Sequence, residues 1–474
     1  LPSTLSYNGQ STFNSTYDLE LNDFIRRSKM WYNGGWTMGY HEKRYYLDQY
    51  LGIKYYITNK IDINNDNYDY GKDLTIPFDG KNWEVEYDEN GNYQNKLSER
   101  QDYNENIPWG YELVNDNYKY YRVYKNTNHL GIGYMVDSII SSSTVGTNSY
   151  ATYYEKLYTD AAIIESDKID EIQEKGNFNK LTSYSDGYEY VSQSSWDKYF
   201  SPREDYEKRD NQNVIAARKE HKLSNGNISK SEISKILPSN SQFFHKRWEE
   251  KNRLGDQIIL KMNGNSVCPL ATENNKCYIN FSFKMGPRVL ISMYNDDVLV
   301  TQDAHMVSTA SLSTTSYEWK TQRGFYVNQP INKIVIEFVQ DTSYDKVFNS
   351  GNSIPTMSTY YQYQSKIDQT YEKIKDNLLY DVDYKKDTFT FKTNTNEDKI
   401  SVTTIPYDTG WTLKNKKDGN IIETFNVNGG FIGFIPLKGE NEYELSYYTP
   451  YLNEGIVCSL FGLLMFIALN YVYS

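Results

Sequence analysis

Apolar and polar residues alternate with a period of two along much of the chain, and this pattern predicts a mostly β protein. In the segment RVLISMYNDDVLVTQ, the apolar residues Val289, Ile291 and Met293 alternate with their neighbours ahead of an Asn-Asp-Asp turn. The segment INKIVIEFV repeats the pattern further along. Strands at such short spacing indicate a jelly-roll-like β-sandwich over residues 257–348.

Helical spacing replaces this alternation in a few segments. KRYYLDQYL places four apolar or aromatic residues on one helical face, and Gly52 follows as a stop signal. SKIDQTYEKIKDNLL has the same spacing and predicts a linking amphipathic helix. Helices beside strands and hairpins predict an α+β fold that is predominantly β.

These patterns predict four parts of the chain. Residues 1–145 read as a mixed α/β domain, and residues 146–365 as a β-sandwich domain with a charged helical insertion. Residues 366–454 read as the linking helix followed by a small C-terminal β-sandwich. Residues 455–473 read as a transmembrane helix.

The predicted transmembrane helix is the segment GIVCSLFGLLMFIALNYVY, which carries no charge and is long enough to cross a bilayer. No Lys or Arg follows Gly439, whereas several glutamates precede the helix, so the positive-inside rule predicts that this approach lies outside the cytoplasm. The first residues, LPSTLSYNGQ, lack the features of a signal peptide. We therefore expect an excised extracytoplasmic part of a larger protein of the cell membrane.

Composition narrows the classes of partner. The net charge is -12, and the basic residues are scattered, which disfavours a nucleic-acid partner. Tyrosine is abundant, at 47 residues. This abundance reflects either stacking on sugars or a coding bias towards Asn, Lys, Tyr and Ile.

Motifs of serine, metal or nucleotide chemistry are absent from the sequence, so no catalytic residue is assigned and no cofactor is expected in this segment. The neighbouring acids Asp296 and Asp297 could serve a glycosidase, although a polar turn explains them as well. The segment DINNDNYDYGKD approaches the spacing of a calcium loop or is a plain Asn-rich loop. Its candidate ligands are Asp62, Asn64, Asp66 and Asp73, but Asn67 replaces the usual glycine and Asp73 the usual glutamate.

Two further groups of residues are candidates for a site or a crosslink. An aromatic cluster could stack on glycans, lie at the membrane surface or pack inside the domain; its members are Trp31, Trp36, Tyr40, Trp83 and Trp109. Cys268 and Cys277 bracket a polar loop that a disulfide could close in an oxidising compartment, and otherwise they are free thiols.

Three segments resemble the YfhO-like family of bacterial membrane proteins: RYYLDQYLGIKYYI, PWGYELV with YRVYKNTNHLGIGY, and IPYDTGWTLKNKKDG with NVNGGFIGFIPLKGENEYELSYYTP. The matching positions look structural; they are Arg44, Asp48, Gly52, Lys54, Tyr55, Gly410, Trp411, Gly419, Phe431, Gly439 and Tyr447. Arg44 and Asp48 are four residues apart on the predicted helix, and Tyr50 stands where leucine is more usual.

The resemblance implies a polytopic, GT-C-like membrane glycosyltransferase with a large extracytoplasmic region before its last helix. It implies transfer of a sugar from a lipid-linked donor to a cell-surface polymer, such as the lipoteichoic acid of Gram-positive bacteria. The catalytic acids of such an enzyme are expected in its membrane core, so none is carried over to this sequence.

We therefore expect this segment to bind or position a glycan acceptor, with the cytoplasmic membrane and a cell-wall polymer or glycolipid as partners. The alternatives are a singly anchored surface adhesin or carbohydrate-binding receptor, and a tethered glycosidase.

Overall fold

The computed structural model describes the chain in segments. The described residues are 12–13, 21–28, 32–33, 37–38, 44–59, 82–87, 93–98, 110–115, 121–145, 151–202, 219–224, 235–236, 256–283, 289–305, 321–338, 358–385 and 388–473. Strands outnumber helices among them, and one long helix lies at the carboxyl end. The prediction of a predominantly β fold with a terminal helix is confirmed.

A seven-stranded mixed sheet forms the centre of the molecule, with the strand order β12-β10-β11-β28-β29-β25-β9. Its strands are β9 (Gly133–Val136), β10 (Ser138–Ser141), β11 (Ala162–Ile164), β12 (Asn179–Leu181), β25 (Ile400–Pro406), β28 (Thr424–Val427) and β29 (Phe431–Phe434). One sheet thus takes strands from all three of the predicted ranges 1–145, 146–365 and 366–454.

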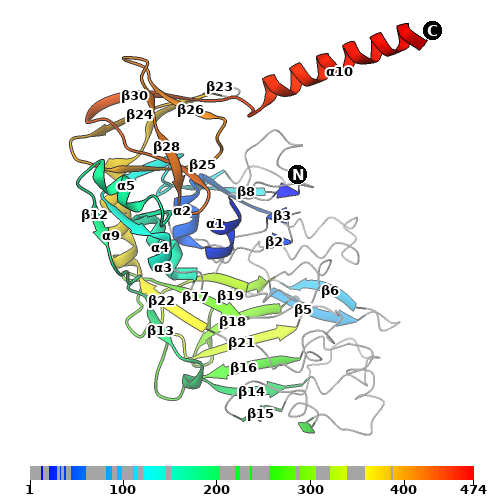
Figure 1. Ribbon diagram of the computed structural model, residues 1–474. Helices are drawn as coiled ribbons and strands as arrows, with labels where there is room; N and C mark the ends of the chain where they lie inside the picture. Colours follow the sequence, from blue (N-terminus) through cyan, green and yellow to red (C-terminus); the bar gives the residue numbers. More distant parts are fainter. Residues whose placement is uncertain are drawn as a thin grey trace.

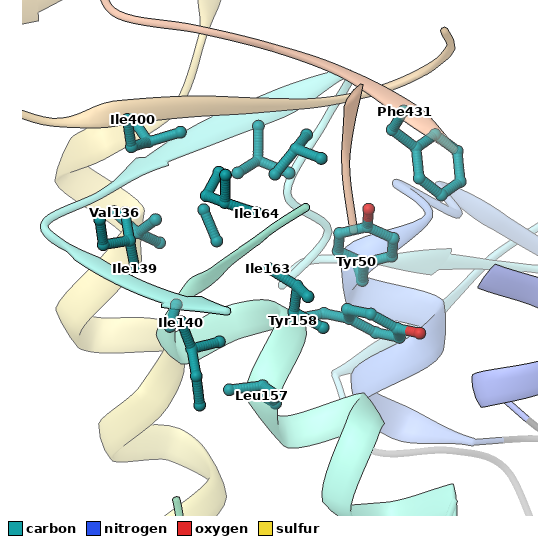
Figure 2. Packing of buried hydrophobic residues seen from close by; sticks show 14 of the residues in the cluster. Tyr50, Val136, Ile139, Ile140, Leu157, Tyr158, Ile163, Ile164, Ile400 and Phe431 are labelled. Atoms are coloured by element: carbon teal, nitrogen blue, oxygen red, sulfur yellow. The ribbon is translucent and has the colours of Figure 1, made fainter. Parts of the chain in front are cut away.

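Helices pack against this sheet and bury its apolar residues. They are α1 (Leu21–Arg27), α2 (Tyr45–Tyr50), α3 (Ser142–Val145), α4 (Ala151–Asp160), α5 (Ile169–Glu174) and α9 (Gln364–Ile374). Residues from α1, α2, α4, α5 and α9 share one buried cluster with the strands. Figure 2 shows Tyr50 of α2 beside Tyr158 of α4 and Phe431 of β29 in this cluster.

The predicted β-sandwich is made of two sheets. One has the order β13-β22-β17-β20, with β13 (Glu189–Val191), β17 (Cys277–Phe283), β20 (Thr321–Val327) and β22 (Ser358–Tyr363). The other has the order β15-β14-β16-β21-β18-β19, with β14 (Asp197–Ser201), β15 (His221–Lys222), β16 (Gln257–Lys261), β18 (Val289–Asn295), β19 (Val298–His305) and β21 (Lys333–Phe338). Alternate residues such as Ile279, Phe281 and Ile291 fill the core between them. The predicted charged insertion lies largely outside the described residues.

A five-stranded antiparallel sheet completes the carboxyl-terminal part, in the order β23-β24-β30-β26-β27. Its strands are β23 (Tyr380–Lys385), β24 (Thr388–Thr395), β26 (Trp411–Asn415), β27 (Ile421–Ile422) and β30 (Gly439–Tyr447). Its inner face packs against residues of β25 and β29 in a separate core, for example Phe391 and Tyr443 against Phe434.

Small sheets occupy the amino-terminal part. One sheet consists of β4 (Tyr55–Asn59), β8 (Tyr121–Asn126) and β7 (Tyr111–Asn115). A second consists of β1 (Thr12–Phe13), β3 (Thr37–Met38) and β2 (Tyr32–Asn33). A third is the pair β5 (Asn82–Tyr87) and β6 (Tyr93–Ser98). In Figure 1 the five-stranded sheet lies at the top, the helices below it and the sandwich at the bottom, while α10 (Leu452–Tyr473) projects away from them.

Candidate functional site at the membrane-proximal rim

The apolar helix α10 is the first feature that any function must explain. It spans 22 residues, three more than the predicted 455–473, and its side chains are exposed. At 1.5 Å per residue it is about 33 Å long, which matches a bilayer core of about 30 Å. Within the described residues it is the one helix long and apolar enough to cross a membrane. An apolar helix that packs on no part of the described fold needs lipid around it.

An aromatic row lies at the end of the five-stranded sheet from which α10 departs. The ring centroids of Tyr384 and Phe389 are 4.7 Å apart, those of Phe389 and Trp411 6.0 Å, and those of Trp411 and Tyr447 4.9 Å. Four adjacent strands, β23, β24, β30 and β26, each contribute one ring. We call these four residues the membrane-proximal rim.

The register of the strands aligns the rim. Tyr384 pairs with Phe389, and Trp411 pairs with Tyr447, which is the last residue of β30 before the chain turns into α10. Gly410 allows this approach, because a Cβ there would lie 2.4 Å from the Tyr448 carbonyl oxygen. The Tyr448 N–H donates to the Gly410 carbonyl at 2.9 Å. Gly410, Trp411 and Tyr447, which match the YfhO-like pattern, thus lie where β26 contacts the end of β30, just before α10.

The rim residues differ in exposure, and Tyr451 at the start of the helix is more exposed than any of them. Phe389, Trp411 and Tyr447 are half-buried, whereas Tyr384 is 58% exposed and Tyr451 is 82% exposed. Tyrosine and tryptophan combine an apolar ring with a polar group, so they suit both the membrane–water interface and the faces of sugar rings. Phe389 and Trp411 also pack against the core beneath the sheet, so Tyr384 is the rim ring with most of its surface open, at the end of the sheet from which α10 departs.

A surface ion pair joins β23 to β24. Lys392 Nζ lies 2.8 Å from Asp381 Oδ2, and this hydrogen bond raises the pKa of Lys392.

The described residues hold no group of His, Cys, Asp and Glu side chains able to bind a metal ion. Asp297, one of the acids considered for a glycosidase, pairs with Lys333, which lowers its pKa. A carboxyl group held ionised in an exposed turn is unsuited to act as a general acid.

The first of the resembling segments surrounds a buried ion pair. Arg44 precedes α2 and donates to the Glu155 carboxylate of α4 and to the Ser28 carbonyl after α1. The side chains of Arg44 and Glu155 are 1% and 0% exposed. Asp48 lies four residues after Arg44, and its carboxylate accepts a hydrogen bond from the Tyr111 hydroxyl at 3.1 Å. Burial and the Asp48 carboxylate raise the pKa of Tyr111, so its phenol stays a donor. Arg44 thus joins three helices.

The first and second resembling segments pack directly on each other. The Leu130 N–H donates to the Gln49 carbonyl at 3.2 Å, and the Asn126 N–H donates to the Lys54 carbonyl at 2.8 Å. Gly52, with φ +65°, approaches so closely that a Cβ would lie 1.9 Å from the Gly131 carbonyl oxygen. The exposed Lys54 lies over the ring of its neighbour Tyr55.

The first segment also contacts the third through Tyr50. Asn428 holds a left-handed φ of 56° and donates from Nδ2 to the Tyr50 hydroxyl at 3.3 Å, while its Oδ1 accepts the Ile163 N–H at 2.8 Å. Phe431 packs edge-on against the Tyr50 ring at 5.6 Å. Tyr50, which stands where leucine is more usual in the family, therefore supplies a polar contact in the core.

The remaining predicted residues are placed as follows. Cys268 and Cys277 form a disulfide with Cα atoms 6.1 Å apart. Trp83 lies in β5. The other members of the aromatic cluster, Trp31, Trp36, Tyr40 and Trp109, lie outside the described residues, and so do the candidate calcium ligands Asp62, Asn64, Asp66 and Asp73.

Sequence reasoning missed Tyr384 and Phe389 of the rim and Glu155 of the ion pair. Both aromatics flank the turn of the hairpin β23–β24, where aromatic pairs are frequent across strands. Glu155 sits on the apolar face of ATYYEKLYTD, between Tyr154 and Leu157. A carboxylate at such a position signals a buried cationic partner.

The comparisons with known proteins concern mainly the carboxyl-terminal part. The family model described as bacterial membrane protein YfhO matches residues 346–459. A protein of Bacillus subtilis (strain 168), described as the uncharacterized protein YfhO, is 36% identical over 84 residues. That match covers 18% of this chain and 10% of the relative, so the chain spans a small part of the relative's length.

Two solved structures have low similarity to this fold. One is the arabinofuranosyltransferase AftD from Mycobacteria, at 11% identity and a TM-score of 0.16, covering 40% of this chain and 14% of that chain. The other is a Paenibacillus cycloisomaltooligosaccharide glucanotransferase, at 6% identity and a TM-score of 0.15, covering 54% of this chain and 45% of that one. Such TM-scores do not define a shared fold.

The family match includes β22 and α9, the whole five-stranded sheet with its rim, and the first part of α10. It therefore coincides with the part of the molecule that carries the aromatic row and the apolar helix. As the third resembling segment predicted, residues 346–459 match the YfhO family of bacterial membrane proteins, so the similarity of this chain to that family is confirmed.

Proposed function

We propose that this chain is the extracytoplasmic, non-catalytic part of a YfhO-like membrane glycosyltransferase, and that its membrane-proximal rim holds a glycan acceptor beside the bilayer. The observation that carries the proposal is the rim itself, in which Tyr384, Phe389, Trp411 and Tyr447 form one aromatic row at the base of α10. Aromatic rows stack on sugar rings and also suit the interface at which a lipid-anchored polymer emerges.

Two independent features support the extracytoplasmic side. The approach to α10 contains glutamates and no Lys or Arg after Gly439, which the positive-inside rule associates with the outer face. The disulfide between Cys268 and Cys277 is stable in oxidising compartments and rare in the reducing cytosol. Both features favour the same side of the membrane.

Retention of a glycan polymer by the rim tests the binding role. The full chain in lipid nanodiscs is passed over immobilised lipoteichoic acid, with Tyr384→Ala compared against Tyr190→Ala. Tyr190 is a matched control, because it is 52% exposed on a strand edge of the sandwich, away from α10. We expect Tyr384→Ala to weaken retention at least fivefold and Tyr190→Ala to leave it unchanged. Equal retention of both variants would remove the rim from glycan binding.

Labelling of an introduced cysteine tests the orientation. Lys385, the last residue of β23, is exposed and is replaced by cysteine (Lys385→Cys), while the native Cys458 lies within α10. We expect a membrane-impermeant maleimide to label this cysteine in intact protoplasts. Labelling that appears only after lysis would put the described fold in the cytoplasm and contradict the proposal.

A further inference from the structure

A short junction connects the five-stranded sheet to α10. Strand β30 ends at Tyr447 and α10 begins at Leu452, so residues 448–451 form the whole connection. We call these four residues the helix junction. The pyrrolidine ring of Pro450 fixes its φ, which removes one degree of freedom from an already short link. Figure 1 shows α10 leaving the sheet directly and projecting away from the rest of the fold.

Hydrogen bonds tie the helix junction to the elements at both of its ends. The Tyr448 N–H donates to the Gly410 carbonyl at 2.9 Å, which continues the pairing of β30 with β26. The Tyr448 hydroxyl donates to Asn453 Oδ1 at 2.6 Å, and Asn453 lies in the first turn of α10. The Leu452 N–H donates to the Thr449 carbonyl at 3.3 Å. Because one residue bridges the sheet and the helix, the direction of α10 is coupled to that of the sheet.

Tyr451 has a backbone conformation that costs free energy. Its φ is +58°, in the left-handed region where the Cβ atom of an L-residue crowds the following carbonyl oxygen. Of the non-glycine residues with such a φ in the described part of the chain, Tyr451 is the only aromatic one. Its side chain is 82% exposed, so packing on the described fold does not offset the cost. An exposed aromatic ring held out by an unfavourable backbone conformation indicates a partner outside the fold.

The bilayer is the partner that lies nearest to these rings. The segment from Gly455 to Tyr473 is uncharged and lies within the membrane, so the helix junction lies where the chain passes through the headgroups. Tyr448 is 54% exposed, although its hydroxyl is already bonded to Asn453, so the open part of this residue is its ring. Tyrosine is enriched at membrane interfaces because it combines an apolar ring with a polar hydroxyl. Residues 440–474 contain no Lys or Arg, so this surface does not attract anionic lipids by charge.

We propose that the helix junction is a bilayer-docking surface, in which the rings of Tyr448 and Tyr451 lie among the phospholipid headgroups and hold the five-stranded sheet at a fixed height above the membrane. The interfacial layer of the bilayer is the partner, because the surface is continuous with the lipid-exposed side of α10. Tyr448 couples the direction of the sheet to that of the helix, and Tyr451 sets the depth. The proposal rests on α10 crossing the membrane and does not depend on glycan binding by the rim.

Photocrosslinking tests the contact with lipid. The photoreactive residue p-benzoylphenylalanine replaces Tyr451 in the full chain, in nanodiscs of phosphatidylcholine and phosphatidylglycerol, and mass spectrometry measures lipid adducts after irradiation. The same replacement of Leu437 is the matched control, because Leu437 is 41% exposed and precedes the opposite end of β30. At about 3.4 Å per residue, this strand is about 27 Å long. We expect at least fivefold more lipid adduct from position 451 than from position 437.

Two outcomes of this experiment would overturn the proposal. One is a lipid adduct no more abundant at position 451 than at position 437. The other is a crosslink from position 451 to a peptide of this chain in place of lipid, because the ring would then pack on protein. If the variant at position 451 does not fold by circular dichroism, the photoreactive residue replaces Tyr448 with the same expectation.

A spin label tests the fixed height. Lys385→Cys in a Cys458→Ala background carries the label, and power saturation with oxygen and a nickel chelate measures its depth relative to the headgroups. Tyr451→Gly tolerates the left-handed φ and removes the ring, whereas Tyr451→Trp keeps a ring suited to the interface. We expect the depth to shift in Tyr451→Gly and to be retained in Tyr451→Trp. The same depth with and without the ring would overturn the proposal. Neither experiment contains a glycan, so failure of the rim to bind glycan leaves both results unaffected.

Discussion

Replacing Gly52 by alanine is expected to push apart the first and second resembling segments, which contact each other just after α2. Gly52 has φ +65°, and an alanine Cβ there would lie 1.9 Å from the Gly131 carbonyl oxygen. The left-handed conformation alone costs an L-residue roughly 1–2 kcal/mol. Relief of the clash requires the backbones to move apart, which breaks the bonds from the Leu130 N–H to the Gln49 carbonyl and from the Asn126 N–H to the Lys54 carbonyl. With about 1 kcal/mol for each hydrogen bond lost, the total loss is about 3–4 kcal/mol.

Gly131→Ala provides the matched control. Gly131 has nearly the same φ, +66°, but no atom lies within 4 Å of a Cβ built there. It should therefore lose only the conformational part, roughly 1–2 kcal/mol. The difference of about 2 kcal/mol between the variants isolates the close backbone approach, and it corresponds to a melting temperature roughly 4–8 °C lower for Gly52→Ala.

Differential scanning calorimetry in detergent micelles measures the melting temperatures, and hydrogen exchange at the Leu130 amide reports the local contact. We expect faster exchange at Leu130 in Gly52→Ala than in Gly131→Ala. Equal melting temperatures and equal exchange would show that the two segments are not held at the distance described, and the reasoning would fail.

The remaining predictions concern buried polar groups. Arg44→Met alone should cost about 3–5 kcal/mol because it strands the buried Glu155 charge, and the double variant with Glu155→Leu should recover most of this loss in urea denaturation; no recovery would contradict the pairing. Asn428→Ala should cost about 2–3 kcal/mol and Tyr50→Phe about 1 kcal/mol, because the asparagine serves two partners and the tyrosine one; equal losses would count against this. Burial and nearby lysines lower the pKa of His129 below 6.5, so the unfolded chain binds the proton more readily. Stability should therefore fall as the pH drops from about 7.5 to about 5.5, and His129→Gln should flatten this dependence in thermal melts.

The sandwich and the terminal helix were predictable because each has a long, regular pattern. Strands such as β18 and β21 carry apolar residues at alternate positions over six or seven residues, so one face is unambiguous. The helix α10 needs only an uncharged run of sufficient length. Neither prediction depends on which distant segment pairs with which.

The central sheet and the rim were not predictable for the opposite reason. β10 and β11 are only four and three residues long and buried on both faces, so they show no period that identifies strands. Trp411 and Tyr447 were picked out by resemblance, but their alignment with Tyr384 and Phe389 follows from strand register across the five-stranded sheet. Register between strands far apart in sequence is decided by packing and turn geometry.

The order of the central sheet also bears on how the chain folds during synthesis. β9 ends at Val136, and its neighbour β25 begins at Ile400, so the edge of β9 stays open while the whole sandwich is being translated. Open strand edges are sites of misassembly, and contacts between remote segments slow folding. The closing strands emerge shortly before α10, so the last step of folding coincides with delivery of that helix to the lipid. A chaperone that shields β9 during this interval would raise the yield of the native protein.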